Sequence, residues 1–510
     1  MRSEGEQVAS AVTGDVSEEP MTRGTVAEPT RTRLVDHLDP RLVNALTVVG
    51  FGVPVIVYFW LLHRYSVNVI VSDQLSDLTV IGNSYTHLFD WSSLWAQHNE
   101  NRILFPNLIV VLLAHTTNFN IQIEEYLSAA MLVATTFLLI WAHKRRSPGT
   151  PWLYYCPVAL LGCSVVQYEN TLWGFQMAWY LVLLSLATAV VLIDRVRLTW
   201  LVMTGAIVAA VIGSFSSLQG LLIWPAGLVL LYHRRRSTRF VVVWIGVAIA
   251  SAVVYFYRFD TNAGSPRHGY ALQHPLATVK FYIFAAGDII GVPQHYYGPG
   301  NNAVLLLGIV ILVMAALTLV VYGIRRDEEG GSPIGVALIC VGLLFIATVT
   351  AGRVLFGYTA ASQSRYTTYD LLIPIGIFLS LLEWPSAFKS RQPSMAESGI
   401  GSPTEVRPGE RVRETMLLVT RWVLAAVIVV QVVLGFHYGL EGAKINYAYQ
   451  QRSVEVTRNI DSTNNERVEL FLDVLGPGAS YIRHQVRIAQ EHHLSTFSGT
   501  SDMSGVRRSR

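Results

Sequence analysis

Charged residues and cysteines are both scarce in this chain. Only 14% of its 510 residues are charged, whereas a soluble protein carries about 25%, so the soluble globular class is excluded. The formal net charge of +3 is too small to indicate nucleic acid as a partner, and none is expected. The three cysteines all lie within hydrophobic runs. Cys156 and Cys163 would be about 10 Å apart along one helix, too far for a disulfide bond.

Long hydrophobic segments make up much of the chain. Hydrophobic residues make up 52% of the chain, and its mean hydropathy is +0.39. A helix needs roughly 20 apolar residues to cross a hydrocarbon core about 30 Å thick. Many segments approach this length, so the sequence predicts an all-α polytopic membrane protein with about 11 transmembrane helices. The predicted spans are residues 42–62, 121–142, 151–167, 173–193, 199–214, 217–232, 240–257, 303–322, 333–351, 370–384 and 416–436.

Short basic clusters give the predicted orientation. The polar leader 1–41 lacks the apolar core of a secretory signal peptide and is predicted to be a disordered cytoplasmic extension. With this leader inside, the positive-inside rule also places the Ser-, Pro-, Gly- and Arg-rich linker 385–415 in the cytoplasm. The protein is therefore expected in the plasma (inner) membrane, with its active face and C-terminus outside. The basic clusters that the rule assigns to the cytoplasm are Lys144–Arg146, Arg195 with Arg197, Arg234–Arg236 and Arg325–Arg326.

Two further apolar stretches, 103–117 and 276–292, are predicted not to cross the membrane. Each offers about 15 usable residues, or about 22 Å of helix. If both crossed, three basic clusters would face outward, against the positive-inside rule. We therefore expect interfacial or re-entrant helices on the outer side. The transmembrane domain then covers 42–436 with a large first outer loop at 63–120, and 437–510 forms a small outer tail.

The first outer loop carries the densest set of reactive side chains. Asp73 and Asp77 are four residues apart, so a helix would place both carboxylates on one face. A run of five polar residues then precedes an apolar helix. The functional interpretation is a catalytic carboxylate with substrate ligands around it, and the alternative is a solvated loop. The run is His98-Asn99-Glu100-Asn101-Arg102, of which Glu100 is a further candidate base and His98, Asn99 and Arg102 are candidate substrate ligands.

Two outer turns are rich in amides and aromatic residues. Amide groups can hydrogen-bond sugar hydroxyls while an aromatic face stacks on the C–H surface of the ring. The alternative is helix capping together with an aromatic belt at the membrane surface. The candidate sugar ligands are Gln167, Glu169, Asn170, Trp173, Gln176 and Gln219.

A third outer group is cationic. Arg353 and Arg365 oppose the positive-inside trend, and arginine grips a phosphate through two parallel hydrogen bonds. Gln363 and Tyr366 flank Arg365 and are candidate ligands with it. The alternative is snorkelling toward lipid headgroups. No closed ligand set predicts a structural zinc, while a carboxylate-bound Mg²⁺ or Mn²⁺ that bridges a phosphate is left open.

In layout, residues 42–436 resemble the GT-C superfamily of integral-membrane glycosyltransferases. The shared features are a first span, a long outer loop with acidic residues, many further spans and an outer tail. In that family the first outer loop carries a catalytic acidic motif, which by position corresponds to Asp73 or Asp77. The family's acidic pair is commonly adjacent or near-adjacent, whereas this pair is four residues apart and Glu100 competes with it. The resemblance implies a polyprenyl-phosphate sugar donor, a glycan, lipid or protein acceptor, and contact with membrane lipid.

The predicted mechanism follows from the chemistry of such a donor. A carboxylate takes the proton of the acceptor hydroxyl, and arginine stabilises charge on the departing phosphate. One alternative is a polymerase or ligase of lipid-diphosphate-linked glycans, which also needs outer arginines. The other is a non-enzymatic transporter or lipid-binding membrane protein, although transporters usually show repeats and ionisable groups near mid-span.

Overall fold

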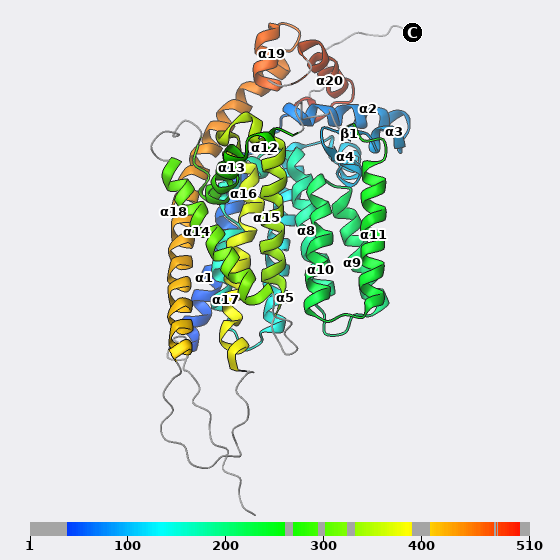
Figure 1. Ribbon diagram of the computed structural model, residues 1–510. Helices are drawn as coiled ribbons and strands as arrows, with labels where there is room; N and C mark the ends of the chain where they lie inside the picture. Colours follow the sequence, from blue (N-terminus) through cyan, green and yellow to red (C-terminus); the bar gives the residue numbers. More distant parts are fainter. Residues whose placement is uncertain are drawn as a thin grey trace, which may run out of the picture.

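The computed structural model is almost entirely helical in the residues that it describes (Figure 1). In that part of the chain the only strands are β1 (Gln97–His98) and β2 (Asn101–Arg102), which pair antiparallel with His98 opposite Asn101. Most of the predicted leader and of the predicted linker lies outside the described residues. The described residues are 38–260, 269–293, 301–323, 332–389, 408–473, 476 and 478–499.

Seven apolar helical segments in the described part of the chain are long enough to cross a membrane, which supports a multi-pass membrane protein. Each contains, or consists of, one long helix and has at most two charged residues in its apolar window. These helices are α1 (Pro40–Tyr65), α5 (Ile121–Arg146), α8 (Met177–Ile193), α11 (Thr238–Phe256), α14 (Asn301–Thr318), α15 (Ile334–Arg353) and α18 (Pro408–Arg458).

The other four predicted spans are not among these seven, so the predicted number of 11 is not confirmed. Residues 151–167 break into short turns around the seven-residue helix α6 (Cys156–Gly162). Helix α9 (Trp200–Ser214) has 15 residues, about 22 Å, and Leu218–His233, which contains α10, is similarly short. The fourth, α17 (Leu372–Lys389), packs along α15. Apolar composition predicts where helices form better than how far each continues.

Local signals explain where several helices begin and end. Asp39 caps α1 by accepting a hydrogen bond from the backbone N of Arg41. Asn120 caps α5 in the same way through Gln122. Helix α4 (Leu104–Thr117) is followed by Asn118, which adopts the left-handed conformation typical of a helix terminus.

Three of the four predicted basic clusters meet at one end of the helices, the lower end in Figure 1. Asp194, which follows α8, is fully buried there. One oxygen lies 3.3 Å from Arg146 Nε at the end of α5, and the other lies 2.6 Å from Arg234 Nη2 after α10. Ser332 Oγ donates to Asp194 over 3.3 Å. We call these four residues the lower hub. The fourth predicted basic cluster, Arg325–Arg326, lies outside the described residues.

The opposite, upper end carries the short helices of the first long loop. In Figure 1, α2 (Asp77–Thr86), α3 (Trp91–Leu94) and α4 (Leu104–Thr117) lie there, above or beside the upper ends of α8 and α11. Helix α13 (Pro275–Gly287) also lies toward this end. At 14 and 13 residues, α4 and α13 are too short to span a hydrocarbon core. The stretches 103–117 and 276–292, which were expected not to cross the membrane, therefore contain helices that are too short to cross it.

The last long helix rises well beyond the others. At 51 residues, α18 is about 77 Å long, more than twice the thickness of a hydrocarbon core. Its upper part carries α19 (Asn465–Leu472), α20 (Ala479–Glu491) and the 3₁₀ turn η12 (Ser495–Phe497). Figure 1 shows α20 lying over α2. The C-terminal part of the chain therefore returns to the first long loop.

Candidate functional site

The two aspartates of the first loop lie at the start of α2. A 3₁₀ turn, η2 (Ser72–Ser76), leads directly into the helix, and Asp77 is its first residue. The side chain of Asp73 is 39% exposed, while Asp77 is 2% exposed. Because the turn is tighter than an α-helix, the two carboxylates face different surroundings although only three residues separate them.

His98 connects the β1–β2 ribbon to Asp73. Its Nε2 lies 3.7 Å from Asp73 Oδ1, and its Nδ1 lies 3.2 Å from Ser76 Oγ. Its ring packs on Phe175, with 4.9 Å between ring centres. Burial alone would lower the pKa of His98, but the hydrogen bond and charge of Asp73 raise it overall, helped by two further carboxylates. The imidazole therefore favours its protonated, cationic form beside Asp73.

Asp73 and Asp77 differ sharply in acidity. Burial would raise the pKa of Asp73, but the hydrogen bond and charge of His98, together with Arg365 and Arg353, lower it overall. Burial raises the pKa of Asp77 to about 7; His98 opposes this shift and the charge of Asp73 adds to it. Near neutral pH, Asp73 is an ionised and accessible carboxylate, whereas Asp77 is a buried group that retains much of its proton.

The two predicted phosphate-binding arginines lie near these carboxylates. Arg353 Nη2 donates to Glu100 Oε1 over 2.8 Å, with both side chains about one-third exposed. Arg365 packs over the ring of Tyr366, 5.5 Å from its centre, and its charge acts on Asp73. The structure thus brings together the predicted base loop and the predicted arginines, although they are separated by more than 250 residues.

The amide-rich turn joins the same region. Glu169 Oε2 accepts from the backbone N of Arg365 over 2.9 Å, and Asn170 Nδ2 donates to the Arg365 carbonyl over 2.8 Å. A Cβ at Gly174 would overlap both the Glu124 carboxylate and the Gln74 amide. A side chain at position 174 would therefore force the Gln74 and Glu124 groups to move from their present contact.

Gln74 and Glu124 were missed by the sequence analysis. Both are fully buried, and Gln74 Nε2 donates to Glu124 Oε2 over 2.7 Å. A signal for Glu124 existed, since an ionisable residue inside a predicted span is costly and usually functional. Gln74 carried no comparable signal apart from its position between the two aspartates.

Several other predicted ligands are held by the protein itself. The Arg102 guanidinium donates to the carbonyls of Trp95, Tyr255, Tyr257 and Arg258, and so ties the ribbon to the end of α11. Gln167 Nε2 donates to the backbone of residues 162 and 164. Gln219 accepts from Ser217, which also donates to Asn101 Oδ1 over 2.8 Å. These contacts give Arg102, Gln167 and Gln219 a structural role in this conformation.

A further group of predicted ligands keeps hydrogen-bonding capacity. The side chain of Asn99 lies 3.2 Å from His98 Nε2, and Tyr366 stacks on Trp179 with 6.1 Å between ring centres. Buried polar atoms without a hydrogen-bond partner occur throughout the described helices, and six of them belong to residues of this region. Those six atoms are Gln74 Oε1, Glu100 Oε2, Glu124 Oε1, Trp173 Nε1, Gln176 Oε1 and Gln363 Oε1.

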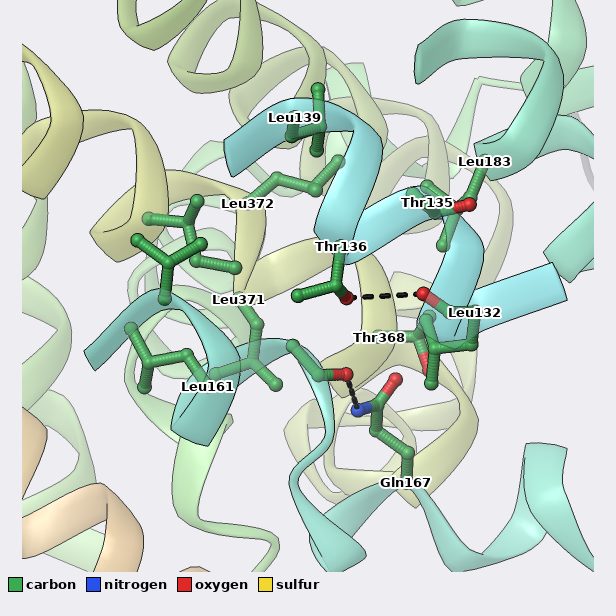
Figure 2. A pocket seen from close by; sticks show the side chains of 13 residues that line it. Leu132, Thr135, Thr136, Leu139, Leu161, Gln167, Leu183, Thr368, Leu371 and Leu372 are labelled. Atoms are coloured by element: carbon green, nitrogen blue, oxygen red, sulfur yellow. Dashed lines mark hydrogen bonds between the residues drawn. The ribbon is translucent and has the colours of Figure 1, made fainter. Parts of the chain in front are cut away.

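A small cavity lies between the helices rather than at the upper surface (Figure 2). Leucines dominate its wall, and Gln167 and Thr368 contribute polar groups. In Figure 2 a dashed line joins the Gln167 amide nitrogen to a backbone carbonyl, that of residue 162. At about 20 Å³ the cavity has room for roughly one water molecule. It is far too small to bind a sugar.

The described residues contain no group of three or more His, Cys, Asp or Glu side chains arranged to hold a metal ion. Asp73, Asp77 and His98 are close to one another, but Asp77 is only 2% exposed, so the three do not form an open ligand set for Mg²⁺ or Mn²⁺. The charge balance of the site instead comes from His98 and the two arginines.

Comparison with known proteins finds no match to a family model, to a curated protein or to a solved structure. The resemblance to the GT-C superfamily therefore rests on the layout of spans and loops.

Proposed function

We propose that this protein is a membrane glycosyltransferase. It would move a sugar from a polyprenyl-phosphate donor to a hydroxyl of a glycan, lipid or protein acceptor. The observation that carries the proposal is the arrangement of an accessible, ionised Asp73 beside His98, with Arg353 and Arg365 close enough to act on its charge. A general base and cations for a leaving phosphate are the two elements that this reaction needs.

Asp73 is the better candidate for the base. A base must be ionised and accessible to an acceptor hydroxyl. Asp73 has a lowered pKa and a side chain that is 39% exposed, whereas Asp77 has a raised pKa and is 2% exposed. In the proposed reaction Asp73 takes the acceptor proton as the hydroxyl oxygen attacks the anomeric carbon. His98 holds the Asp73 carboxylate in place and keeps it ionised.

The arginines act on the leaving group. As the bond between the anomeric carbon and the phosphate oxygen breaks, negative charge grows on the phosphate, and Arg353 and Arg365 stabilise it. Glu100 orients Arg353 through its 2.8 Å contact. Glu169 and Asn170 fix the backbone of Arg365. These contacts position both cations before the donor binds.

The proposed orientation places the upper end outside the plasma (inner) membrane. The lower hub and its neighbouring basic clusters would then lie in the cytoplasm with the N-terminus, as the positive-inside rule requires. The segments around α6, α9, α10 (Ile223–His233) and α17 would complete 11 crossings, because the 3₁₀ turns Trp152–Tyr155 and Val165–Gln167 extend α6 and the turn Leu218–Leu222 extends α10. The scissile bond of a lipid-linked sugar lies at the membrane surface, where the site would meet it.

The test uses the full chain in lipid nanodiscs with radiolabelled polyprenyl-phosphate monosaccharides and a panel of glycan, lipid and peptide acceptors. We expect label to move to one acceptor class, and we expect Asp73→Asn to abolish that movement. Asp461→Asn is the matched control, because Asp461 is an exposed aspartate of the C-terminal region.

Two outcomes would overturn the proposal. Transfer from diphosphate-linked oligosaccharides alone would identify a polymerase or ligase instead. Flux of the lipid-linked sugar across proteoliposomes, with no product formed, would identify a transporter.

A further inference from the structure

Helix α20 packs on the first turns of α2, directly beyond the Asp73–Asp77 turn. Gln485 is 2% exposed, and its amide faces the hydroxyl of Thr79. The two groups are joined through both atoms of the amide, at 3.0 Å from Nε2 and 3.2 Å from Oε1. A buried polar side chain that found no such partner would be costly. This pair is therefore a specific connection between helices 406 residues apart in sequence.

The contact continues along one face of α2. Residues 79, 82 and 85 recur every three positions and so line one side of the helix. A Cβ at Gly82 would lie 3.1 Å from Ile488 of α20, which shows how closely the backbones approach. One turn later, the rings of Tyr85 and His492 stack with 4.0 Å between their centres. Helix α20 therefore contacts this face of α2 at three positions, while Thr79 and Tyr85 themselves stay partly exposed.

The same C-terminal segment also holds the chain before the turn. Ser495 Oγ donates to Asn68 Oδ1 over 3.0 Å, and Thr496 Oγ1 donates to the Asn68 carbonyl over 2.8 Å. Contacts at Asn68 and at Thr79 therefore lie on both sides of Asp73 and Asp77 in the sequence.

A backbone hydrogen bond adds a third anchor. The backbone N of Ser495 donates to the Asn118 carbonyl over 2.8 Å, and Asn118 ends α4 at the far side of the first long loop. The C-terminal segment is therefore attached at three places around the turn rather than resting on one.

The segment is in turn fixed to the long helix α18. Arg483 Nη2 donates to the Thr463 carbonyl over 2.6 Å and to Asn465 Oδ1 over 3.1 Å. The backbone N of Ala479 donates to Glu469 Oε1 over 2.9 Å. These bonds connect α20 to the turn that follows α18 and to α19. Because α19 packs on α18, these bonds connect α20 indirectly to the upper end of the long helix.

We propose that residues 479–497 form a C-terminal clamp that holds the Asp73–Asp77 turn in its reactive geometry, with Gln485 as the positioning residue. The effect on turnover rests on the proposed function, whereas the effect on local order does not. Gln485 acts through Thr79 and the first turn of α2, so it is not a catalytic residue. The half-buried Tyr481, whose pKa is raised by burial and by nearby carboxylates that include Asp77 and Asp73, lies on the side of the clamp toward the site.

We expect substitution of Gln485 to have a large effect on turnover. A displacement of about 1 Å at a reacting group can reduce a rate about 100-fold. We expect Gln485→Ala to lower kcat by about 10- to 100-fold while leaving the KM for the donor nearly unchanged, because the arginines are untouched. Thr79→Val should behave similarly, and Thr79→Ser should restore kcat because it keeps the hydroxyl.

Hydrogen–deuterium exchange of the full chain in nanodiscs tests the clamp without a substrate. We expect Gln485→Ala, and more strongly Gln485→Ala with Ser495→Ala, to speed exchange in residues 66–82. Exchange near the lower hub, at residues 190–196, should stay unchanged. His484→Ala is the matched control, since His484 is an exposed residue next to Gln485 on α20.

The two proposals fail in different ways. Unchanged exchange at residues 66–82 in the double variant, or an equal increase along the whole chain, would overturn the clamp. If the wild type transfers sugar and Gln485→Ala keeps its full kcat, the clamp is also wrong while the glycosyltransferase stands. If exchange increases locally but the wild type transfers no labelled polyprenyl-phosphate sugar, the clamp stands and the proposed function is wrong.

Discussion

The two ends of the molecule use carboxylates in opposite ways. At the lower end, fully buried Asp194 contacts Arg146, Arg234 and Ser332, so both of its oxygens are engaged. At the upper end, Asp73 is partly exposed and meets a histidine at 3.7 Å. Asp77 is buried beside it with a raised pKa.

The comparison distinguishes a carboxylate that stabilises the fold from a carboxylate that is available for chemistry. A carboxylate surrounded by arginines has no capacity left for another ligand, but breaking its contacts leaves uncompensated buried charge. A carboxylate that keeps an open oxygen beside cations can still accept a proton or attract a ligand. The lower hub therefore serves to join helices, and the upper cluster is suited to chemistry.

The largest expected effect is on turnover at the upper end. Asp73→Asn should reduce sugar transfer by about 10²- to 10⁴-fold, the usual contribution of a general base, while the thermal midpoint changes little. Initial rates with a labelled polyprenyl-phosphate sugar measure it, and Asp461→Asn should match the wild type. Full activity in Asp73→Asn together with loss in Glu100→Gln would move the base to Glu100.

Substitutions in the lower hub should reduce stability and leave turnover unchanged. Asp194→Ala removes the partner of two buried arginines and should cost about 3–5 kcal/mol of stability, read as a lower unfolding temperature in detergent. Ser332→Ala, which removes one hydrogen bond to Asp194, should cost only about 1 kcal/mol. The rate per folded molecule should stay the same. An Asp194 variant with normal stability and no transfer would show that the comparison between the two ends is wrong.

The raised pKa of Asp77 predicts that folded stability depends on pH, an effect of intermediate size. Its pKa is about 4 when unfolded and about 7 in the folded protein, so the unfolded chain releases this proton first. Folded stability from this group is therefore fully present below pH 4 and decreases as pH rises toward 7, by at most about 1.4 kcal/mol per pH unit. Asp77→Asn should remove that decrease. Thermal unfolding of both proteins between pH 4 and 8 measures it, and parallel curves would contradict the raised pKa.

The smallest effect on stability is expected for Glu100→Gln. Its contact with Arg353 is about one-third exposed on each side, and exposed ion pairs contribute about 0–1 kcal/mol. The unfolding temperature should hardly change, but the KM for the donor should increase several-fold because Arg353 loses the group that orients it. A large drop in unfolding temperature would place this pair with the lower hub instead.

The sequence could predict the helical class and the segregation of charge between the two ends. Both follow from composition and from clusters such as Arg234–Arg236 that are visible locally. It could also place Asp73, Asp77 and His98 in one loop. It could not choose between the two aspartates, because that choice depends on burial, which the 3₁₀ turn before Asp77 determines.

The sequence analysis could not predict contacts between segments that are far apart in the chain. Arg102 looked like a substrate ligand, yet the carbonyls that hold it lie about 150 residues away at the end of α11. Gln485 and Thr79 are ordinary residues in isolation, and their pairing appears only when α20 lies on α2. The number of spans was not confirmed for a related reason, since apolar composition at 151–167 does not reveal that the helix there stops after seven residues.

The position of the clamp on α18 has a consequence for biosynthesis. The loop that bears Asp73 follows the first long helix, whereas Gln485 and Ser495 are synthesised only after α18. In the proposed topology, the clamp cannot reach Asn68 and Thr79 until that helix has been inserted and its upper end has crossed the bilayer. Under the proposed topology, the reactive loop stays without its C-terminal contacts throughout translation of the intervening helices. Partially inserted chains would thus lack the ordered site, and sugar transfer would begin only once the last helix is in place.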